Sequence, residues 1–146
     1  MLGTEAVTKI LREKGFKVTP QRLAVYDALS STKSHPNAEM LYNMLQPSYP
    51  TMSLATVYKT MDIFAELGLI QVLNVGEDSY RYDAETASHP HIRCTECNRV
   101  DDIFNFQDEG LMNGVEAKTG YQLSGRQLYF FGCCPHCQEK ASALRH

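Results

Sequence analysis

The pattern of apolar positions in the first half of the chain predicts four short helices. Apolar residues recur at spacings of three and four, which places them on one face of each helix. In chain order they are Val7, Ile10 and Leu11; Leu23, Val25, Tyr26 and Leu29; Met40, Leu41, Met44 and Leu45; and Leu54, Val57, Met61, Phe64 and Leu67. Thr19 and Ser53 are residue types favoured immediately before a helix, and the third helix is predicted to begin around Asn37. Gly15 and Gly68 are favoured immediately after one.

A predicted β-hairpin follows the fourth helix directly. Residues 69–75 and 80–82 form its strands, and residues 76–78, which read Gly-Glu-Asp, form its turn. Short helices followed by a hairpin is the element order of a winged helix-turn-helix, in which the last helix enters the major groove of DNA. We therefore predict a winged helix-turn-helix DNA-binding domain over residues 1–83.

Strands dominate the remainder, residues 84–146, which we predict to be a small α/β domain. The predicted strands are residues 89–93, 99–104 and 127–133. A helix is predicted over residues 108–119, with Leu111, Met112 and Val115 facing inward. A domain of about 60 residues has a marginal core, so we expect a zinc knuckle and dimerisation to stabilise it. The predicted fold class of the whole chain is α+β.

The predicted fourth helix presents small and polar side chains opposite its apolar face. These are Ala55, Thr56, Tyr58, Lys59 and Asp62. Side chains of this kind can contact base edges and phosphates in a groove. Lys17 and Arg22 are further candidates for phosphate contacts, because the first 22 residues hold five basic residues and two acidic ones. The alternative is that this face is only solvated, and the pattern leaves both interpretations open.

Composition is that of an ordinary globular chain, with 43% hydrophobic and 21% charged residues. The net charge of −3 does not itself suggest nucleic acid, so the DNA interpretation depends on the local pattern. The apolar runs are too short for a membrane-spanning helix, and the first residues lack the features of a signal peptide. We expect a cytoplasmic protein, whose five cysteines stay reduced and favour metal over disulfides.

Two Cys-x2-Cys pairs predict a structural zinc site. Cys94 and Cys97 form the first pair, and Cys134 and Cys137 form the second. Thiolates at this spacing lie on one tight turn, so two such turns can bind one Zn²⁺ ion from two directions. Cys133 could replace Cys134, because its spacing from Cys137 is also feasible, although we expect it to serve packing. Disulfides or inert buried thiols are the alternatives to zinc.

Histidines and aspartates next to the first cysteine pair predict a second, different metal site. His89 and His91 are two residues apart, so both side chains leave the same face of a strand. Asp83 and Asp102 flank them, and imidazole with carboxylate suits Fe²⁺, Mn²⁺ or Zn²⁺. His35, between the second and third helices, is a candidate third imidazole, but spacing does not establish that it reaches this site. Ordinary surface histidines are the alternative.

An enzyme is the competing function from another class. A metallohydrolase could use His89, His91 and a carboxylate to hold catalytic zinc. It would need a base beside the open coordination position, and Glu85 is the nearby candidate. No motif for a substrate pocket accompanies Glu85, which makes this interpretation weak.

Four segments resemble the Fur family of metal-responsive repressors. They are Val18-Thr-Pro-Gln-Arg22, Ala55-Thr-Val-Tyr-Lys-Thr60, His89-Pro-His91-x2-Cys94-x2-Cys97, and Gly132-x-Cys134-x2-Cys137. The similarity spans essentially the whole chain. It implies a DNA-binding repressor and not an enzyme, with a C-terminal dimerisation domain. It also implies a homodimer on inverted-repeat DNA, with Tyr58 on the recognition helix.

The resemblance also implies a role for each candidate ligand. The residues matching the structural zinc site are Cys94, Cys97, Cys134 and Cys137. The residues matching the regulatory Fe²⁺ or Mn²⁺ site, which bridges the two domains, are His35, Asp83, His89, His91 and Asp102. Five ligands leave one position of an octahedral ion open to a small molecule.

Two details resemble the peroxide-sensing branch of the family, PerR. Both carboxylates of the regulatory set are aspartates, where iron-sensing members usually have glutamates. Ser88, Pro90 and Arg126, none of them a good ligand, occupy the positions of a further histidine-rich site. The predicted function is therefore a repressor that senses hydrogen peroxide through iron-catalysed oxidation of a histidine ligand, His35 or His89. The alternative is an iron-responsive repressor of iron uptake genes.

Overall fold

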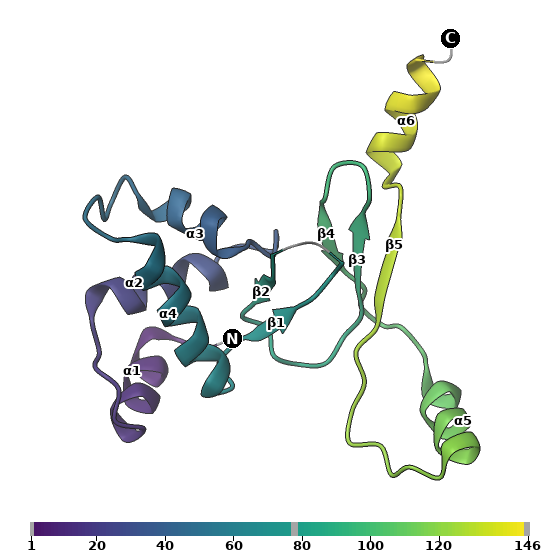
Figure 1. Ribbon diagram of the computed structural model, residues 1–146, viewed down its shortest axis with the longest axis horizontal. Coiled ribbons are helices and arrows are strands. Elements are labelled where there is room, and N and C mark those ends of the chain that lie inside the picture. Colours follow the sequence, from purple (N-terminus) through teal and green to yellow (C-terminus); the bar gives the residue numbers. More distant parts are fainter. Residues whose placement is uncertain (1, 77–78, 145–146) are drawn as a thin grey trace. The chain divides into compact units, whose positions relative to one another are not determined.

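A computed structural model describes residues 2–76 and 79–144, in which the chain forms two compact units (Figure 1). The boundary between the units along the chain lies between Thr86 and Ala87, close to the predicted boundary after residue 83. Within the described part of the chain, no helix combines the length and apolar character needed to cross a membrane. The mixed α+β class predicted for the chain is confirmed.

The N-terminal unit contains four helices followed by a hairpin, in the predicted order (Figure 1). The helices are α1 (Thr4–Glu13), α2 (Pro20–Ser30), α3 (Ala38–Leu45) and α4 (Leu54–Glu66). The strands β1 (Gln71–Leu73) and β2 (Arg81–Asp83) pair antiparallel. β1 is shorter than the predicted strand 69–75, whereas β2 has the predicted length and begins one residue later than predicted. The predicted turn at 76–78 includes residues 77 and 78, which lie outside the described residues.

Helix boundaries in this unit follow the capping residues. The side chains of Thr19, Asn37 and Ser53 each accept a hydrogen bond from the amide three residues further on, at 3.1, 2.8 and 3.1 Å. These bonds satisfy amides that have no partner inside the helix. Gly15 and Gly68 have φ values of 81° and 72°, a left-handed conformation that residues with a β-carbon rarely adopt. The predicted boundary signals therefore act as expected.

The core of the N-terminal unit is built from the inward faces of its four helices. Fully buried apolar side chains include Val7, Leu11, Val25, Leu29, Leu41, Val57, Met61 and Phe64. The Phe64 ring meets the Tyr26 ring edge-on, with centroids 5.7 Å apart. Met40 and Met44 are 41% and 48% exposed, because α3 turns its Leu41 face inward. The predicted apolar stripe of α3 was thus too wide.

The C-terminal unit is a three-stranded sheet with two helices. Its elements are β3 (His91–Cys94), β4 (Val100–Asp102), α5 (Glu109–Thr119), β5 (Tyr129–Gly132) and α6 (Pro135–Leu144). The strand order is β4-β3-β5, with β3 antiparallel to β4 and parallel to β5. The helix α6 was not predicted, because residues 135–144 were interpreted only through their cysteine spacing.

The prediction that α5 turns Leu111, Met112 and Val115 inward is wrong. Leu111 is 47% and Val115 is 40% exposed, and none of the described α5 side chains is buried. Within this unit α5 stands at the end of long connections, away from the three strands (Figure 1). An apolar helix face needs a facing surface, and the sheet of the same unit does not supply one.

Phe64 provides a test of the N-terminal core. Phe64→Ala removes a ring that is completely buried, so the free energy of unfolding of this unit should fall by about 3–5 kcal/mol. Glu66→Ala, on the exposed side of the same helix, should change it by less than about 0.5 kcal/mol. Denaturant unfolding followed by circular dichroism measures both. Equal effects from the two variants would contradict this description of the core.

Candidate metal centres and nucleic-acid interface

The four cysteines of the two Cys-x2-Cys pairs come together at one end of the C-terminal sheet. Cys94 ends β3, and Gly132, its parallel partner in register, ends β5. The segments that follow the two strands therefore begin at the same end of the sheet. The sulfur atoms of Cys94, Cys97, Cys134 and Cys137 all lie within 4.8 Å of one another. Four thiolates at this separation suit a closed tetrahedral zinc site.

Backbone amides already point at these sulfurs. The amide of Cys134 donates to the sulfur of Cys94 at 3.3 Å, and the amide of Glu96 donates to it at 3.4 Å. Hydrogen bonds of this kind, chiefly from the Cys134 and Cys97 backbone, lower the pKa of Cys94 to about 6. The thiol of Cys137 is instead hydrogen-bonded to the Cys134 sulfur, which raises its pKa to about 12. The fold thus stabilises negative charge on Cys94 first.

Cys133 lies outside this group of four, although it is adjacent to Cys134 in the chain. Its side chain is exposed, and its pKa is raised by desolvation and by the nearby charges of Cys94 and Glu96. Of the two alternatives that spacing left open, the structure groups Cys134 with the other three cysteines.

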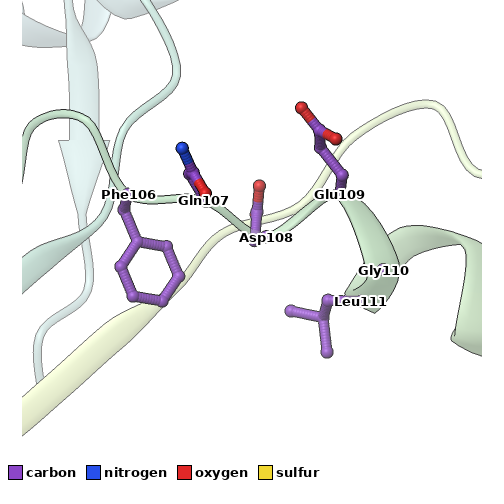
Figure 2. Close-up of a pocket in the computed structure, with 6 residues that line it drawn as sticks. All are labelled: Phe106, Gln107, Asp108, Glu109, Gly110 and Leu111. Atoms are coloured by element: carbon purple, nitrogen blue, oxygen red, sulfur yellow. The ribbon is translucent and has the colours of Figure 1, made fainter.

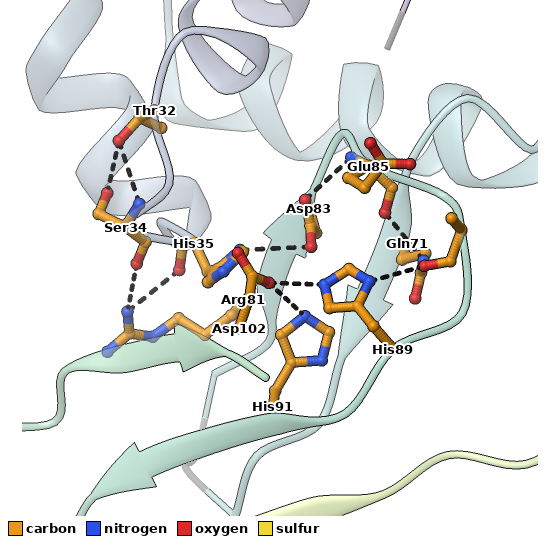
Figure 3. Close-up of polar contacts among 11 residues, drawn as sticks. Thr32, Ser34, His35, Gln71, Arg81, Asp83, Glu85, His89, His91 and Asp102 are labelled. Atoms are coloured by element: carbon orange, nitrogen blue, oxygen red, sulfur yellow. Dashed lines mark hydrogen bonds and ion pairs between the residues drawn. The ribbon is translucent and has the colours of Figure 1, made fainter. Parts of the chain in front are cut away.

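The predicted regulatory ligands divide between the two units, with His35 and Asp83 in the N-terminal one. Nδ1 of His35 is 3.5 Å from Oδ2 of Asp83, and both side chains are buried. The other Asp83 oxygen, Oδ1, accepts a hydrogen bond of 2.9 Å from the amide of Glu85 (Figure 3). This second contact fixes the carboxylate so that Oδ2 faces the imidazole.

His89, His91 and Asp102 form a compact cluster in the C-terminal unit. Nε2 of His89 is 2.6 Å and Nε2 of His91 is 3.2 Å from the same oxygen, Oδ1 of Asp102 (Figure 3). His91 lies directly opposite Asp102 in the β3–β4 pairing, and the two imidazole centroids are 4.5 Å apart. Nδ1 of His89 contacts the carbonyl oxygen of Ala87 at 2.7 Å, and Phe104 stacks on the His89 ring. Both rings are therefore fixed with one nitrogen toward a shared carboxylate.

The candidate DNA-contacting side chains of α4 lie mainly on its exposed face. Ala55, Lys59 and Asp62 are exposed. Tyr58 is 42% exposed, although the residue before it, Val57, is buried in the core. Thr56 is different, because it is half-buried and its hydroxyl contacts the capping Ser53 hydroxyl at 2.9 Å.

The two candidate basic residues before and within α2 also differ. Lys17 is exposed, whereas Arg22 is half-buried and donates from Nη1 to the Lys17 carbonyl oxygen at 2.6 Å. Arg22 therefore holds the segment that enters α2, in addition to carrying charge.

A shallow hollow at the start of α5 is lined by six consecutive residues, Phe106 to Leu111 (Figure 2). Phe106 and Leu111 point to one side of it, while Gln107, Asp108 and Glu109 point to the other (Figure 2). Asp108 forms an ion pair with Arg126. Arg126 therefore connects the start of α5 to the segment before β5. The hollow belongs to a loop surface and gathers no set of metal ligands.

Comparisons with known proteins identify related regulators. A sequence model of the ferric uptake regulator family matches residues 13–131. The transcriptional regulator PerR of Clostridium acetobutylicum is 50% identical over 135 residues, which cover 92% of this chain and 98% of that protein. The peroxide-responsive repressor PerR of Staphylococcus aureus is 32% identical over 130 residues, covering 89% of this chain and 88% of that protein.

Solved structures show the same fold. The ferric uptake regulator Fur of Helicobacter pylori aligns with a TM-score of 0.79 at 24% identity, covering 92% of this chain and 90% of that one. The peroxide stress regulator of Campylobacter jejuni aligns with a TM-score of 0.68 at 30% identity, covering 94% of this chain and 100% of that one. With a family match over most of its length, this chain belongs to the ferric uptake regulator family.

Proposed function

We propose that this protein is a metal-dependent transcriptional repressor that releases DNA when hydrogen peroxide oxidises one of its histidine ligands. The observation that carries the proposal is the convergence of His89 and His91 on one oxygen of Asp102. The pair His35–Asp83 offers the same chemistry in the other unit. The relatives named peroxide-responsive repressors support the peroxide signal. Action on DNA would place the protein in the cytoplasm.

The proposed regulatory ligands are three imidazoles and two carboxylates. They are His35, Asp83, His89, His91 and Asp102. Nitrogen with hard oxygen donors suits Fe²⁺ and Mn²⁺, and five donors leave one octahedral position open. Only five residues separate Asp83 from His89, so one ion could bind ligands from both units without a long connection to order. Such an ion would restrict the hinge between the units.

The four grouped cysteines are proposed to hold a structural Zn²⁺ ion. Few apolar side chains of the C-terminal unit are buried, Cys94 and Val100 among them, so its core alone is small. Zinc would bind thiolates from the β3–β4 turn, the end of β5 and the first turn of α6. Because the ligands come together only in the folded state, the free energy of zinc binding would stabilise the fold.

A homodimer is proposed to cover the apolar surface of the C-terminal unit. β5 is at one edge of the sheet, and its Phe130 and Phe131 are 39% and 52% exposed. The Phe106 ring lies near Phe130, with centroids 5.8 Å apart. The exposed α5 residues Leu111 and Val115 form a further apolar surface of this unit. Apolar surface of this extent on a small unit is typical of a protein–protein interface.

DNA recognition is proposed for the exposed face of α4. Tyr58 and Lys59 could contact a thymine methyl group, a guanine or a phosphate, and Lys17 could add a phosphate contact. A dimer reads two half-sites of an inverted repeat only when its two winged helices have the right spacing. A metal ion that favours one hinge geometry would therefore tighten binding by selecting that geometry.

The proposed peroxide response uses the open coordination position. Iron held by these residues would catalyse a two-electron transfer in which one oxygen atom of hydrogen peroxide adds to an imidazole carbon and the other leaves as water. His35 and His89 would be the oxidised side chains, and the His89 ring is already fixed by its contacts with Asp102 and Ala87. An oxidised imidazole is a weaker donor, so the ligand set would lose its metal and the hinge would relax. The zinc thiolates are coordinatively saturated and should resist low peroxide concentrations.

A cysteine pair of variants tests the zinc site. Cys97→Ser should release zinc and abolish the dimer, because it removes one of four grouped ligands. Cys133→Ser, the matched control, should retain both. Zinc per chain is measured by elemental analysis, and the mass in solution by light scattering. Equal zinc loss in both variants would show that the assignment of the ligands is wrong.

Two further variants test DNA recognition and its dependence on metal. His91→Ala should abolish the tightening of DNA binding by Mn²⁺ while leaving zinc content and fold intact. Tyr58→Ala should weaken specific binding by about 1–3 kcal/mol with metal present, since a base or phosphate contact is lost. Fluorescence anisotropy at one salt concentration, with an operator selected from random DNA, measures both. Tight specific binding by metal-free wild-type protein would contradict the proposed switch.

Mass spectrometry tests the peroxide response. A stoichiometric pulse of peroxide on the Fe²⁺ form should add one oxygen to a peptide that contains His35 or His89. The Mn²⁺ form, treated in the same way, should show no addition. If cysteine sulfur is oxidised first, or if the iron form is not oxidised, peroxide sensing is excluded. An iron-responsive repressor of iron uptake genes would then be the function.

A further inference from the structure

Strand β2 holds the loop that carries His35 through two consecutive residues. Nη1 of Arg81 donates to the carbonyl oxygens of His35 and Ser34, at 3.1 and 3.5 Å (Figure 3). The amide of Tyr82 donates to the carbonyl oxygen of Pro36 at 3.1 Å. Three successive carbonyl groups of the loop thus accept hydrogen bonds from one strand. Within the N-terminal unit, this strand fixes the path of the loop.

Arg81 is only 4% exposed, and among the described residues it is the one arginine that is buried. Removing a guanidinium group from water is costly, and hydrogen bonds must offset that cost. A lysine would offer a single point of charge, whereas the planar guanidinium presents several donors in fixed directions. A buried arginine at this position therefore points to a geometric role for its donors.

His35 needs such a restraint, because its backbone conformation is unfavourable. Its φ angle is 51°, in the left-handed region that residues with a β-carbon seldom adopt. The following residue is Pro36, and a residue before proline prefers an extended conformation. The carbonyl groups of Ser34 and His35 belong to the peptide planes on either side of the His35 α-carbon. Hydrogen bonds to both planes fix the two dihedral angles that direct the imidazole.

We propose that Arg81 is a positioning residue for His35, which holds the imidazole toward Asp83 before the regulatory metal binds. The inference rests on the proposed function, in which His35 is a ligand of that metal. Without Arg81 the loop would sample extended conformations, and part of the binding free energy would be spent on ordering it. Residues that orient a ligand in this way typically change metal affinity by about 10–100-fold when replaced.

The variants Arg81→Met and Arg81→Lys test this role in the full-length, zinc-loaded protein. Arg81→Met keeps a long side chain but donates no hydrogen bond, and it should weaken Mn²⁺ binding by about tenfold or more. Arg81→Lys retains a charged donor for one carbonyl group and should fall between Arg81→Met and the wild type. Arg12→Met, on the exposed side of α1, is the matched control and should bind Mn²⁺ like the wild type. Zinc content and circular dichroism establish that each variant is folded.

A double-mutant cycle separates positioning from general destabilisation. If Arg81 acts through His35, adding Arg81→Met to His35→Ala should change Mn²⁺ affinity by less than about twofold, because coupled residues are not additive. Additive losses would overturn the inference. The inference is also overturned if Arg81→Met and Arg81→Lys both bind Mn²⁺ with full affinity while His35→Ala binds it weakly. Full affinity in His35→Ala itself would reject the regulatory ligand set, and the inference with it.

The site of oxidation gives an independent readout. In the Fe²⁺ form of Arg81→Met, a peroxide pulse should shift oxygen incorporation from the His35 peptide toward the His89 peptide, relative to the wild type. His89 is held by Asp102 and Ala87 within the C-terminal unit, so its orientation should persist. A structural defect alone would lower incorporation at both histidines in proportion. An unchanged ratio would therefore overturn the positioning role.

Discussion

The pairing of β3 with its two neighbours is the constraint on which both candidate metal sites of the C-terminal unit depend. His91 begins this strand and Cys94 ends it, so a four-residue strand carries one ligand of each site. Antiparallel pairing with β4 sets Asp102 opposite His91, and parallel pairing with β5 sets Gly132 opposite Cys94. A shift of one residue in either register would turn the ligands to the other face of the sheet. The register thus decides whether either site exists.

In this arrangement a zinc ion at the proposed cysteine site would do more than stabilise the fold. A zinc ion bound to the grouped cysteines would fasten the ends of β3 and β5 and prevent the sheet from fraying. His91 and Asp102, at the opposite end of β3, would then keep their orientation while the regulatory metal exchanges. Closed thiolate sites release metal reluctantly, so the cysteines at one end of the strand suit a permanent ion. The histidines and aspartates at the other end suit an exchangeable ion.

Strand β2 has a comparable double position in the N-terminal unit. It is one strand of the hairpin that corresponds to the wing, and it ends in Asp83, a proposed ligand. Arg81 and Tyr82 bind the loop that leads into α3, whose first turn is capped by Asn37. The wing, the His35 loop and the start of α3 are therefore connected by direct hydrogen bonds. A change at His35 or Asp83 therefore has a short covalent and hydrogen-bonded route to the start of α3.

Several features could be predicted from the sequence because they depend on local chemistry. Helix starts at Thr19 and Ser53 follow from side chains that satisfy their own nearby amides, and the Cys-x2-Cys spacing determines a metal-binding turn wherever it folds. The resemblance to the family then named the ligand sets. In the C-terminal unit, the grouping of Cys94 with Cys134 rather than Cys133 required the register of β3 and β5, which links residues far apart in the chain.

Other features were decided only by tertiary structure. The apolar stripe of α5 has helical spacing, but spacing cannot say whether any surface of the same chain faces it, and here none of its side chains is buried. Arg81 looked like an ordinary hairpin residue, because nothing in its sequence neighbourhood marks the loop some 46 residues earlier that it binds. Local patterns determine which helices and turns form, since those depend on neighbours in the chain. Burial and ligand orientation depend on partners that folding brings close, and local sequence patterns do not identify those partners.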